Sequence, residues 1–434
     1  MAKSSMPNYS SVAVFLLLLQ TVVLAEDWPC WRGPRGDGTS LESAIPVSWD
    51  GTTGKNILWK APLVAAGHSS PVIVGDRVYV TGCHEQTKSR HLLALDRETG
   101  KVVWDQTVVN APLETRHQLN SYASGTPTVA DGVIYVTFLV VDGSEIPAPN
   151  VGAPRPVTPG QILVAAYSID GQQLWSVQVG GFISAHGFCS SPVVYQDLLI
   201  VNGDHDGDSY IVAMDRSTGK TVWKTGREHK TRSYCTPIIR TVAGRDQMVL
   251  TGSQRVVSLD PRTGGTHWLI EGPTEQFVSS MVFDGSKFYL TAGFPTHHVM
   301  AIRPDGQGDV TNSHVAWHSD ESKCYVPSPV LCDGRLYVAD DRGTASCYNT
   351  ATGERIWRDR LGSHFSSSLV ATGTQILFTA DDGQTTILAA GDELQKVAEN
   401  QLGEFIYSSP AISDGTIYFR GDQHLIAVRD LGAE

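Results

Sequence analysis

The amino-acid sequence predicts an all-β fold, an eight-bladed β-propeller with four short strands in each blade. Three observations lead to this prediction. One repeat recurs along the chain, each copy holds four apolar stretches, and Asp-Gly or Thr-Gly dipeptides separate those stretches. Such dipeptides tolerate the positive φ angles of tight hairpins. Four strands joined in an antiparallel meander are the content of one propeller blade.

The clearest copies of the repeat span residues 69–104, 190–223 and 327–357. Each begins with a Ser-Pro-Val sequence, passes through a strand with a small residue near its centre, and ends in Trp. We expect this Trp to lie on the outermost strand and to pack between neighbouring blades. The small residue of the third strand leaves room for the indole, and it is Ala94, Ala213 or Cys347 in these copies.

The number of blades follows from the copies and their ends. Six copies end in Trp: Trp104, Trp175, Trp223, Trp268, Trp317 and Trp357. Val397 is expected at the same position of a seventh copy, and an eighth begins at Ser408 but lacks its outer strand. The segment 56–60, which contains Trp59, supplies a matching strand. We therefore expect the first and last segments to share one blade and close the ring, which removes the exposed sheet edge.

Three regions are expected along the chain. Residues 1–25 place Lys3 ahead of an apolar run that ends at Ala25, a pattern typical of a secretory signal peptide. An uncleaved membrane anchor is the alternative. Residues 26–55 contain three Trp and are expected to pack as a strap along the propeller formed by residues 56–434. We expect an exported monomer, periplasmic or extracellular, without a stable membrane span after processing.

The second copy carries a proline-rich insertion at residues 142–160. Its proline content disfavours strands and helices, so a long loop over one face is expected. A lid over a site and a surface loop without a role remain open.

Charge and motifs exclude several kinds of site. The formal net charge is −12 and no run of Lys or Arg occurs, which argues against a nucleic-acid partner. The seven Cys are irregularly spaced and form no CxxC motif, so a zinc knuckle is not indicated. The acidic segment 204–208 suits Ca²⁺ less well than an ordinary turn, because the EF-hand pattern would require Gly where Ser209 stands. No metal site is therefore expected.

A candidate binding site lies in the segments that precede the first strand of each blade. In a propeller these segments lie on one face and converge on the central channel. Aromatic and basic side chains around a concave mouth are typical of a ligand or peptide site, and Arg and Lys would favour an anionic group. The alternative is that these side chains plug the funnel and cap inner strands. The candidate residues are His68, Tyr122, His186, Arg232, Tyr234, Lys323, Tyr325, His364 and Tyr407.

The repeat resembles that of a known family. The signature A-L-D-x-x-T-G-K-x-x-W, at Ala94–Trp104 and, with Met214 in place of Leu, at Ala213–Trp223, is similar to the pyrroloquinoline-quinone-type propeller repeat. The segment from Trp28 to Gly38 is similar to the opening of cofactor-free bacterial members. The resemblance implies one of two functions. One branch contains quinone-dependent dehydrogenases of alcohols or sugars, and the other includes the outer-membrane assembly scaffold that binds partner proteins.

The sequence favours the non-catalytic branch. It contains no adjacent Cys-Cys pair of the alcohol-dehydrogenase type, and no segment matches the family motifs that hold the quinone, its Ca²⁺, a base and an Arg. No catalytic residue is therefore transferred. We expect a binding or scaffold protein without a cofactor, whose ligand at the funnel mouth is a protein, a peptide or a small anion. Pyrroloquinoline quinone with calcium is expected only under the dehydrogenase alternative.

Overall fold

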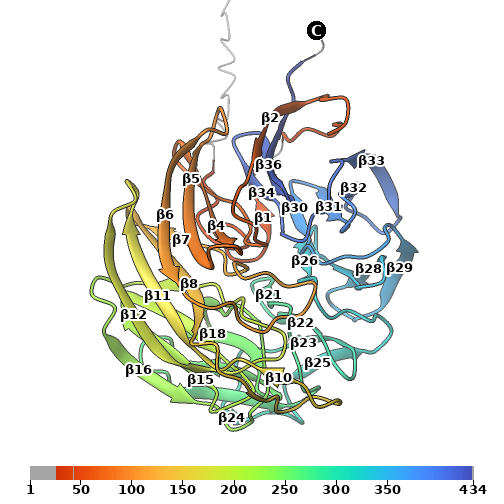
Figure 1. The fold of residues 1–434 in the computed structure, drawn as a ribbon. Coiled ribbons are helices and arrows are strands. Elements are labelled where there is room, and N and C mark those ends of the chain that lie inside the picture. The colour runs from red at the N-terminus through yellow and green to blue at the C-terminus, as the bar shows by residue number, and fades with distance from the viewer. Residues whose placement is uncertain (1–25, 43, 433–434) are drawn as a thin grey trace, which may run out of the picture.

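The computed structural model describes residues 26–42 and 44–432, and it arranges their strands in eight blades around a central axis (Figure 1). The first strands of neighbouring blades contact one another, so these strands line the centre of the ring. The predicted all-β, eight-bladed propeller is confirmed. Within the described residues there is no helix, and hence none that is long and apolar enough to cross a membrane.

The first four blades contain the strands that follow. Blade 1 has β3 (Val72–Val74), β4 (Arg77–His84), β5 (Ser89–Asp96) and β6 (Val102–Asn110); blade 2 has β7 (Thr128–Ala130), β8 (Val133–Val141), β11 (Gly160–Ser168) and β12 (Gln173–Phe182); blade 3 has β13 (Val193–Tyr195), β14 (Leu198–Gly203), β15 (Tyr210–Asp215) and β16 (Thr221–Gly226); blade 4 has β17 (Ile238–Val242), β18 (Arg245–Gly252), β19 (Arg255–Leu259), β20 (Thr266–Glu271) and the added β24 (Gly308–Asp309).

The other four blades complete the ring. Blade 5 has β21 (Val282–Phe283), β22 (Phe288–Ala292), β23 (His298–Ile302) and β25 (Val315–Ser319); blade 6 has β26 (Val330–Cys332), β27 (Arg335–Ala339), β28 (Thr344–Asn349) and β29 (Arg355–Arg360); blade 7 has β30 (Val370–Thr372), β31 (Gln375–Thr379), β32 (Gln384–Ala389), β33 (Gln395–Gln401) and the added β1 (Thr39–Ser40); blade 8 has β34 (Ala411–Ser413), β35 (Thr416–Arg420), β36 (His424–Arg429) and β2 (Ile57–Pro62).

The ring is closed by strand β2, as the sequence predicts. Strand β2 pairs antiparallel with β36, and Trp59 lies opposite Ala427 in that ladder. Blade 8 therefore joins an early strand to three strands from the end of the chain, which lie side by side in Figure 1. The closure gives β36 an outer partner and leaves no open seam between blades 8 and 1.

Each outer-strand Trp packs against a hairpin of the next blade. Trp104 lies opposite Ala94 in the β5–β6 ladder, and its indole N–H donates to the Ile169 carbonyl of blade 2 at 3.1 Å. Gly171 in that hairpin has a φ of +85°, and a Cβ there would lie 2.9 Å from the Trp104 ring. Both the backbone angle and the close indole therefore require glycine. The same indole-to-carbonyl bond recurs at Trp59, Trp175, Trp223, Trp317 and Trp357.

Blade 7 departs from the prediction at its outer strand. Ala398, and not Val397, occupies the Trp position. A bulge shifts the β32–β33 pairing by one residue, so Ala398 lies opposite Ile387 while Val397 is skipped and 42% exposed. An equivalent bulge precedes Trp104 in blade 1. The prediction was wrong because the turn between β32 and β33 is one residue longer than the turn between β5 and β6: Ala398 follows its partner Ile387 by eleven positions, whereas Trp104 follows Ala94 by ten.

The segment 26–42 runs across the end of the central channel. Trp28 pairs with Ile73 of blade 1, and strand β1 adds parallel to β30 of blade 7. Between them the buried Arg32 donates to the carbonyl oxygens of Ser328 at 3.4 Å and Leu369 at 3.3 Å. These contacts link the segment to blades 1, 6 and 7. The predicted signal peptide, residues 1–25, lies outside the described residues.

The proline-rich insertion contains a short hairpin in addition to loop. Strand β9 (Ile146–Pro147) pairs antiparallel with β10 (Pro156–Val157), so the expectation of a structureless loop is corrected. A two-stranded ribbon is all edge, and proline is tolerated at edge positions that need no N–H donor. At its tip, Asn150 accepts a hydrogen bond from Arg232 of the funnel segment at 3.2 Å through its carbonyl oxygen.

Candidate functional site

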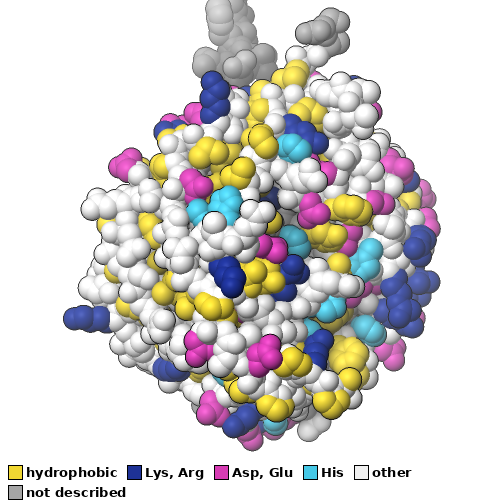
Figure 2. All heavy atoms as spheres, in the orientation of Figure 1, with side chains coloured by type: hydrophobic (Ala, Val, Ile, Leu, Met, Phe, Trp, Pro, Cys, Tyr) yellow, Lys and Arg dark blue, Asp and Glu magenta, His cyan; other side chains and the backbone are white. Residues whose placement is uncertain are grey.

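A cavity of about 330 Å³ opens at the mouth of the central channel. Figure 2 shows that the centre of this face is hollowed, with histidine side chains around the hollow. The cavity is lined by segments that precede the inner strands of several blades. Six of the nine residues predicted from the sequence line it: His68, His186, Tyr234, Tyr325, His364 and Tyr407.

Three predicted residues do not line the cavity. Tyr122 packs beneath the Arg116 guanidinium, whose carbon lies 4.6 Å from the ring centroid. Arg232 is 3% exposed and pairs with Asp206 at 2.5 Å. Lys323 is exposed and lies outside the lining. Of the two basic side chains expected to bind an anionic ligand, Arg232 is therefore neutralised by Asp206 and Lys323 lies outside the cavity.

Nine further lining residues were not predicted, among them His117, Leu119, Asn120 and Asp341. The first three come from the connection between blades 1 and 2, residues 111–127, which is the longest inter-blade connection among the described residues, so its additional residues have no counterpart in the other copies. Asp341 belongs to the turn between β27 and β28, and its Oδ1 accepts a hydrogen bond from the Val326 N–H at 3.0 Å. The turn motif around Asp341 was visible in the sequence, but the direction in which the Asp341 side chain points was not.

Burial keeps the deep histidines neutral. It lowers the pKa of His68 to about 4, with help from the nearby Arg420 charge. It lowers the pKa of His186 to about 3, with help from Arg232. His364 differs, because its Nδ1 lies 2.7 Å from Asp381 and that hydrogen bond raises its pKa. At neutral pH the deep part of the cavity therefore presents imidazoles that donate or accept hydrogen bonds without a charge.

Aromatic rings form the walls and rim of the funnel. Tyr407 packs against His68 with centroids 4.7 Å apart and stacks on Phe405 at 6.3 Å. Phe294 lies 6.5 Å from Tyr325, and both Phe294 and Phe405 are more than half exposed, at 52% and 55%. Exposed rings beside a concave, aromatic cavity are the composition of a surface that binds another molecule.

The acidic segment 204–208 forms ion pairs in place of a cation site. Each of its three carboxylates faces a different basic side chain, so the oxygens do not converge on one point. The pairs are Asp204 with Arg227 at 3.0 Å, Asp206 with Arg232 at 2.5 Å, and Asp208 with Lys230 at 2.7 Å.

The funnel lining does not fit pyrroloquinoline quinone and calcium. The quinone is a tricarboxylate that needs cationic partners, whereas His68 and His186 are neutral and Arg232 is engaged by Asp206. Calcium takes six to eight oxygen ligands, and Asp341 is the one carboxylate among the described lining residues. The lining residues therefore do not match the chemistry that a bound quinone requires.

Comparison with solved structures shows the fold. BamB from Moraxella catarrhalis has a TM-score of 0.59 at 14% identity, covering 87% of this chain and 99% of that one. The quinohemoprotein alcohol dehydrogenase ADHIIG from Pseudomonas putida HK5 has a TM-score of 0.63 at 13% identity, covering 94% and 81%. BamB and an alcohol dehydrogenase thus share this architecture, so the fold does not decide the function.

Comparison with curated sequences shows the family. Outer membrane protein assembly factor BamB of Burkholderia pseudomallei is 26% identical over 377 residues, 83% of this chain and 84% of the relative. The protein of the same name in Yersinia pestis is 24% identical over 371 residues, 82% of each chain. A family model described as outer membrane protein assembly factor BamB matches residues 45–146, 145–287 and 308–396. The chain therefore belongs to this BamB-type family of propellers with pyrroloquinoline-quinone-like repeats.

Proposed function

We propose that this chain is an exported, non-catalytic scaffold protein that binds a segment of another polypeptide at the funnel mouth. One observation carries the proposal. Residues from separate blades surround a single cavity of about 330 Å³ whose lining combines tyrosine rings with neutral histidines.

The chemistry of the funnel suits a polypeptide better than a small anion. Neutral imidazoles and tyrosine hydroxyls exchange hydrogen bonds with backbone groups, and ring faces cover apolar side chains. The cavity has room for a few side chains, while the exposed Phe294 and Phe405 extend the contact outward. An anion would lack free cations, because Arg232 is paired with Asp206.

The family supports a partner in the cell envelope. The relatives are named as outer membrane protein assembly factors. On that ground we take the partner to be an envelope protein and the location to be the periplasm, reached through residues 1–25 as an export signal.

Site-directed photo-crosslinking in the native envelope tests the proposal. A photoreactive phenylalanine analogue at Phe405 should yield a defined cross-linked protein. The same analogue at Val222, which is 54% exposed on the outer strand of blade 3, serves as the matched control and should yield none. A Tyr407→Ala background should weaken the Phe405 product. Equal products from both positions would refute binding at the funnel.

Reconstitution tests the dehydrogenase alternative. The purified chain is mixed with pyrroloquinoline quinone and Ca²⁺, and dye reduction is followed with alcohols and sugars. We expect neither a stoichiometric complex nor turnover, because the funnel lacks the cations and oxygen ligands described above. A complex that oxidises either substrate would overturn the non-catalytic assignment.

A further inference from the structure

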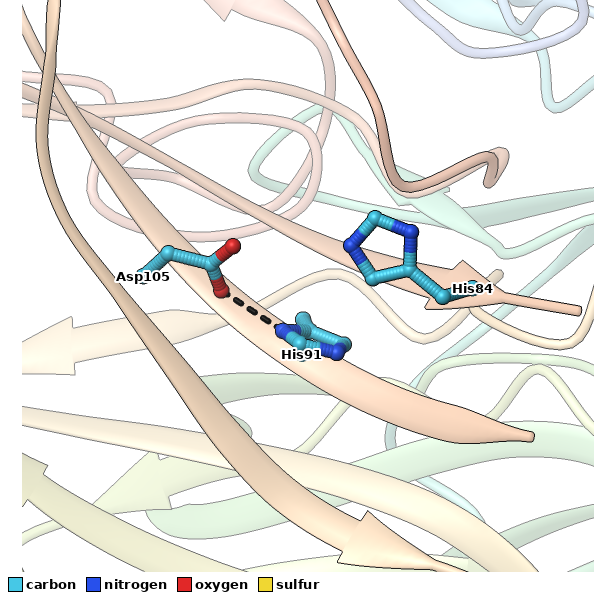
Figure 3. A group of neighbouring side chains, drawn as sticks. All are labelled: His84, His91 and Asp105. Carbon is cyan, nitrogen blue, oxygen red and sulfur yellow. Dashed lines mark hydrogen bonds and ion pairs between the residues drawn. The ribbon is translucent and has the colours of Figure 1, made fainter. Parts of the chain in front are cut away.

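We propose that blade 1 binds a divalent transition-metal ion, Zn²⁺, between His84, His91 and Asp105. The three residues come from strands β4, β5 and β6 and point toward one another (Figure 3). One nitrogen of each histidine and a carboxylate oxygen of Asp105 all lie within 4.8 Å of one another. This site is separate from the funnel, and the proposal does not depend on the proposed scaffold function.

Strand register places the three side chains on one face of the blade. Gly82 lies opposite His91 in the β4–β5 ladder, and His91 lies opposite Thr107 in the β5–β6 ladder. His84 follows Gly82 by two residues and Asp105 precedes Thr107 by two, so both share the face of His91. Because Gly82 has no side chain, Ala65 packs closely against this strand: a Cβ on Gly82 would lie 2.5 Å from the Cβ of Ala65.

The hydrogen bonds of His91 suit a metal ligand, because one ring nitrogen faces a carboxylate and the other has a separate hydrogen-bond partner. Its Nδ1 lies 2.7 Å from Asp105 Oδ1, and its Nε2 lies 2.7 Å from Ser89 Oγ. Zn²⁺ would replace the proton shared between Nδ1 and the carboxylate, and that proton would leave to solvent. Nε2–H would then donate to Ser89 Oγ, whose hydroxyl can donate to Thr87 Oγ1 at 2.7 Å. A ligating histidine commonly holds such a second partner.

His84 supplies the third ligand. Its ring meets the His91 ring edge-on, with centroids 4.5 Å apart and an interplanar angle of 86°. Among the residues the structure describes, neither ring nitrogen of His84 has a hydrogen-bond partner within the cluster (Figure 3). Tetrahedral Zn²⁺ with bonds of about 2.0–2.1 Å separates its ligand atoms by roughly 3.3 Å. Small side-chain rotations bring the cluster to that spacing, because His91 Nδ1 and Asp105 Oδ1 are 2.7 Å apart and no two ligand atoms are more than 4.8 Å apart.

The donor set selects the class of metal. Two imidazoles and one carboxylate suit Zn²⁺ and its transition-metal neighbours, whereas Ca²⁺ and Mg²⁺ require mainly oxygen ligands. The Asp105 side chain is 30% exposed, which leaves solvent access for entry and for a fourth ligand. Val80 and Leu93 on the same blade face belong to the core shared with blade 8, so the ion would sit beside the closure of the ring.

Calorimetric titration of the chelator-treated full chain with Zn²⁺ tests the proposal. We expect one tight site in the wild type, and binding at least about tenfold weaker in His84→Ala and Asp105→Asn. His318→Gln is the matched control, because His298 and His318 form another surface pair, with Nδ1 and Nε2 2.8 Å apart. The control should retain the tight site.

A second measurement separates lost binding from lost folding. Circular dichroism and thermal unfolding in chelator should be the same for wild type and both ligand variants, while added Zn²⁺ should raise the Tm of the wild type alone. Anomalous scattering at the zinc edge should place the ion between His84, His91 and Asp105. Unchanged affinity in both ligand variants, or a zinc peak found only at His298 and His318, would overturn the proposal.

Discussion

Replacing Gly100 with alanine should loosen the ring where blades 8 and 1 meet. Gly100 lies in the β5–β6 hairpin with a φ of +68°, and a Cβ there would lie 2.6 Å from Cε3 of Trp59. Alanine in the left-handed region costs about 1–2 kcal/mol. Displacing a packed indole costs about 1–3 kcal/mol more. The free energy of unfolding should therefore fall by about 2–5 kcal/mol.

Gly132 provides a matched control for the same substitution. It lies in the β7–β8 hairpin with a φ of +76°, and a Cβ there would meet nothing within 4 Å. Gly132→Ala should therefore cost only the backbone part, about 1–2 kcal/mol. Denaturant unfolding followed by circular dichroism measures both variants. Equal losses for Gly100→Ala and Gly132→Ala would refute the steric role assigned to the indole.

A double-mutant cycle isolates the contact itself. Trp59→Ala alone should cost about 3–5 kcal/mol, the range for emptying a buried aromatic site. Once the indole is gone, adding Gly100→Ala should cost only about as much as Gly132→Ala. Additive losses would mean that the glycine and the indole do not act on each other.

Three other predictions test the funnel, the strap and the export signal. In the folded chain the pKa of His68 lies at about 4 and that of His186 at about 3, below the usual 6.5. The unfolded chain therefore takes up protons at a higher pH than the folded chain. The stability that the two neutral histidines contribute is complete above pH 6.5 and is lost as the pH falls through about 4. Acid unfolding curves should show this, and the double variant with glutamine at both positions should lose less stability between pH 6.5 and 4 than the wild type; parallel curves would contradict it. Arg32→Ala should cost about 2–5 kcal/mol, because it leaves buried carbonyl groups in the channel without a donor. Glu98→Gln, which breaks an exposed ion pair, should cost about 0–1 kcal/mol in the same denaturant titration, and similar losses would argue against the strap. Mass spectrometry of the exported chain should find Glu26 at its N-terminus, and an intact leader would favour the membrane anchor instead.

The blades were predictable because their signals are local. The Thr-Gly turn, the small residue of the third strand and the terminal Trp each follow from short-range needs, as at Gly100, Ala94 and Trp104. The error at Val397 arose because the turn between β32 and β33 is one residue longer than the corresponding turn of blade 1. The length of a turn follows from where the two strands pair, and counting residues along the repeat does not reveal it.

The site was less predictable because side-chain partners decide it. The repeat placed Arg232 at the right backbone position, but Asp206 neutralises its charge and turns it from the cavity. Asp341 was recognised as a turn residue, yet only the folded chain shows that it faces the funnel. The cluster of His84, His91 and Asp105 depends on the register of three strands, so the spacing of these residues in the sequence did not predict it.

The closure of the ring by β2 also determines which step of folding comes late. Ile57 is synthesised roughly 370 residues before its partner Val428, so β2 waits on the order of tens of seconds for its ladder at ordinary synthesis rates. During that interval the Trp59 indole and an open strand edge stay exposed. Chaperones bind such surfaces, and aggregation can begin at them. The contacts that finish the ring are the most distant along the chain, so we expect ring completion to be the slow and vulnerable step of folding.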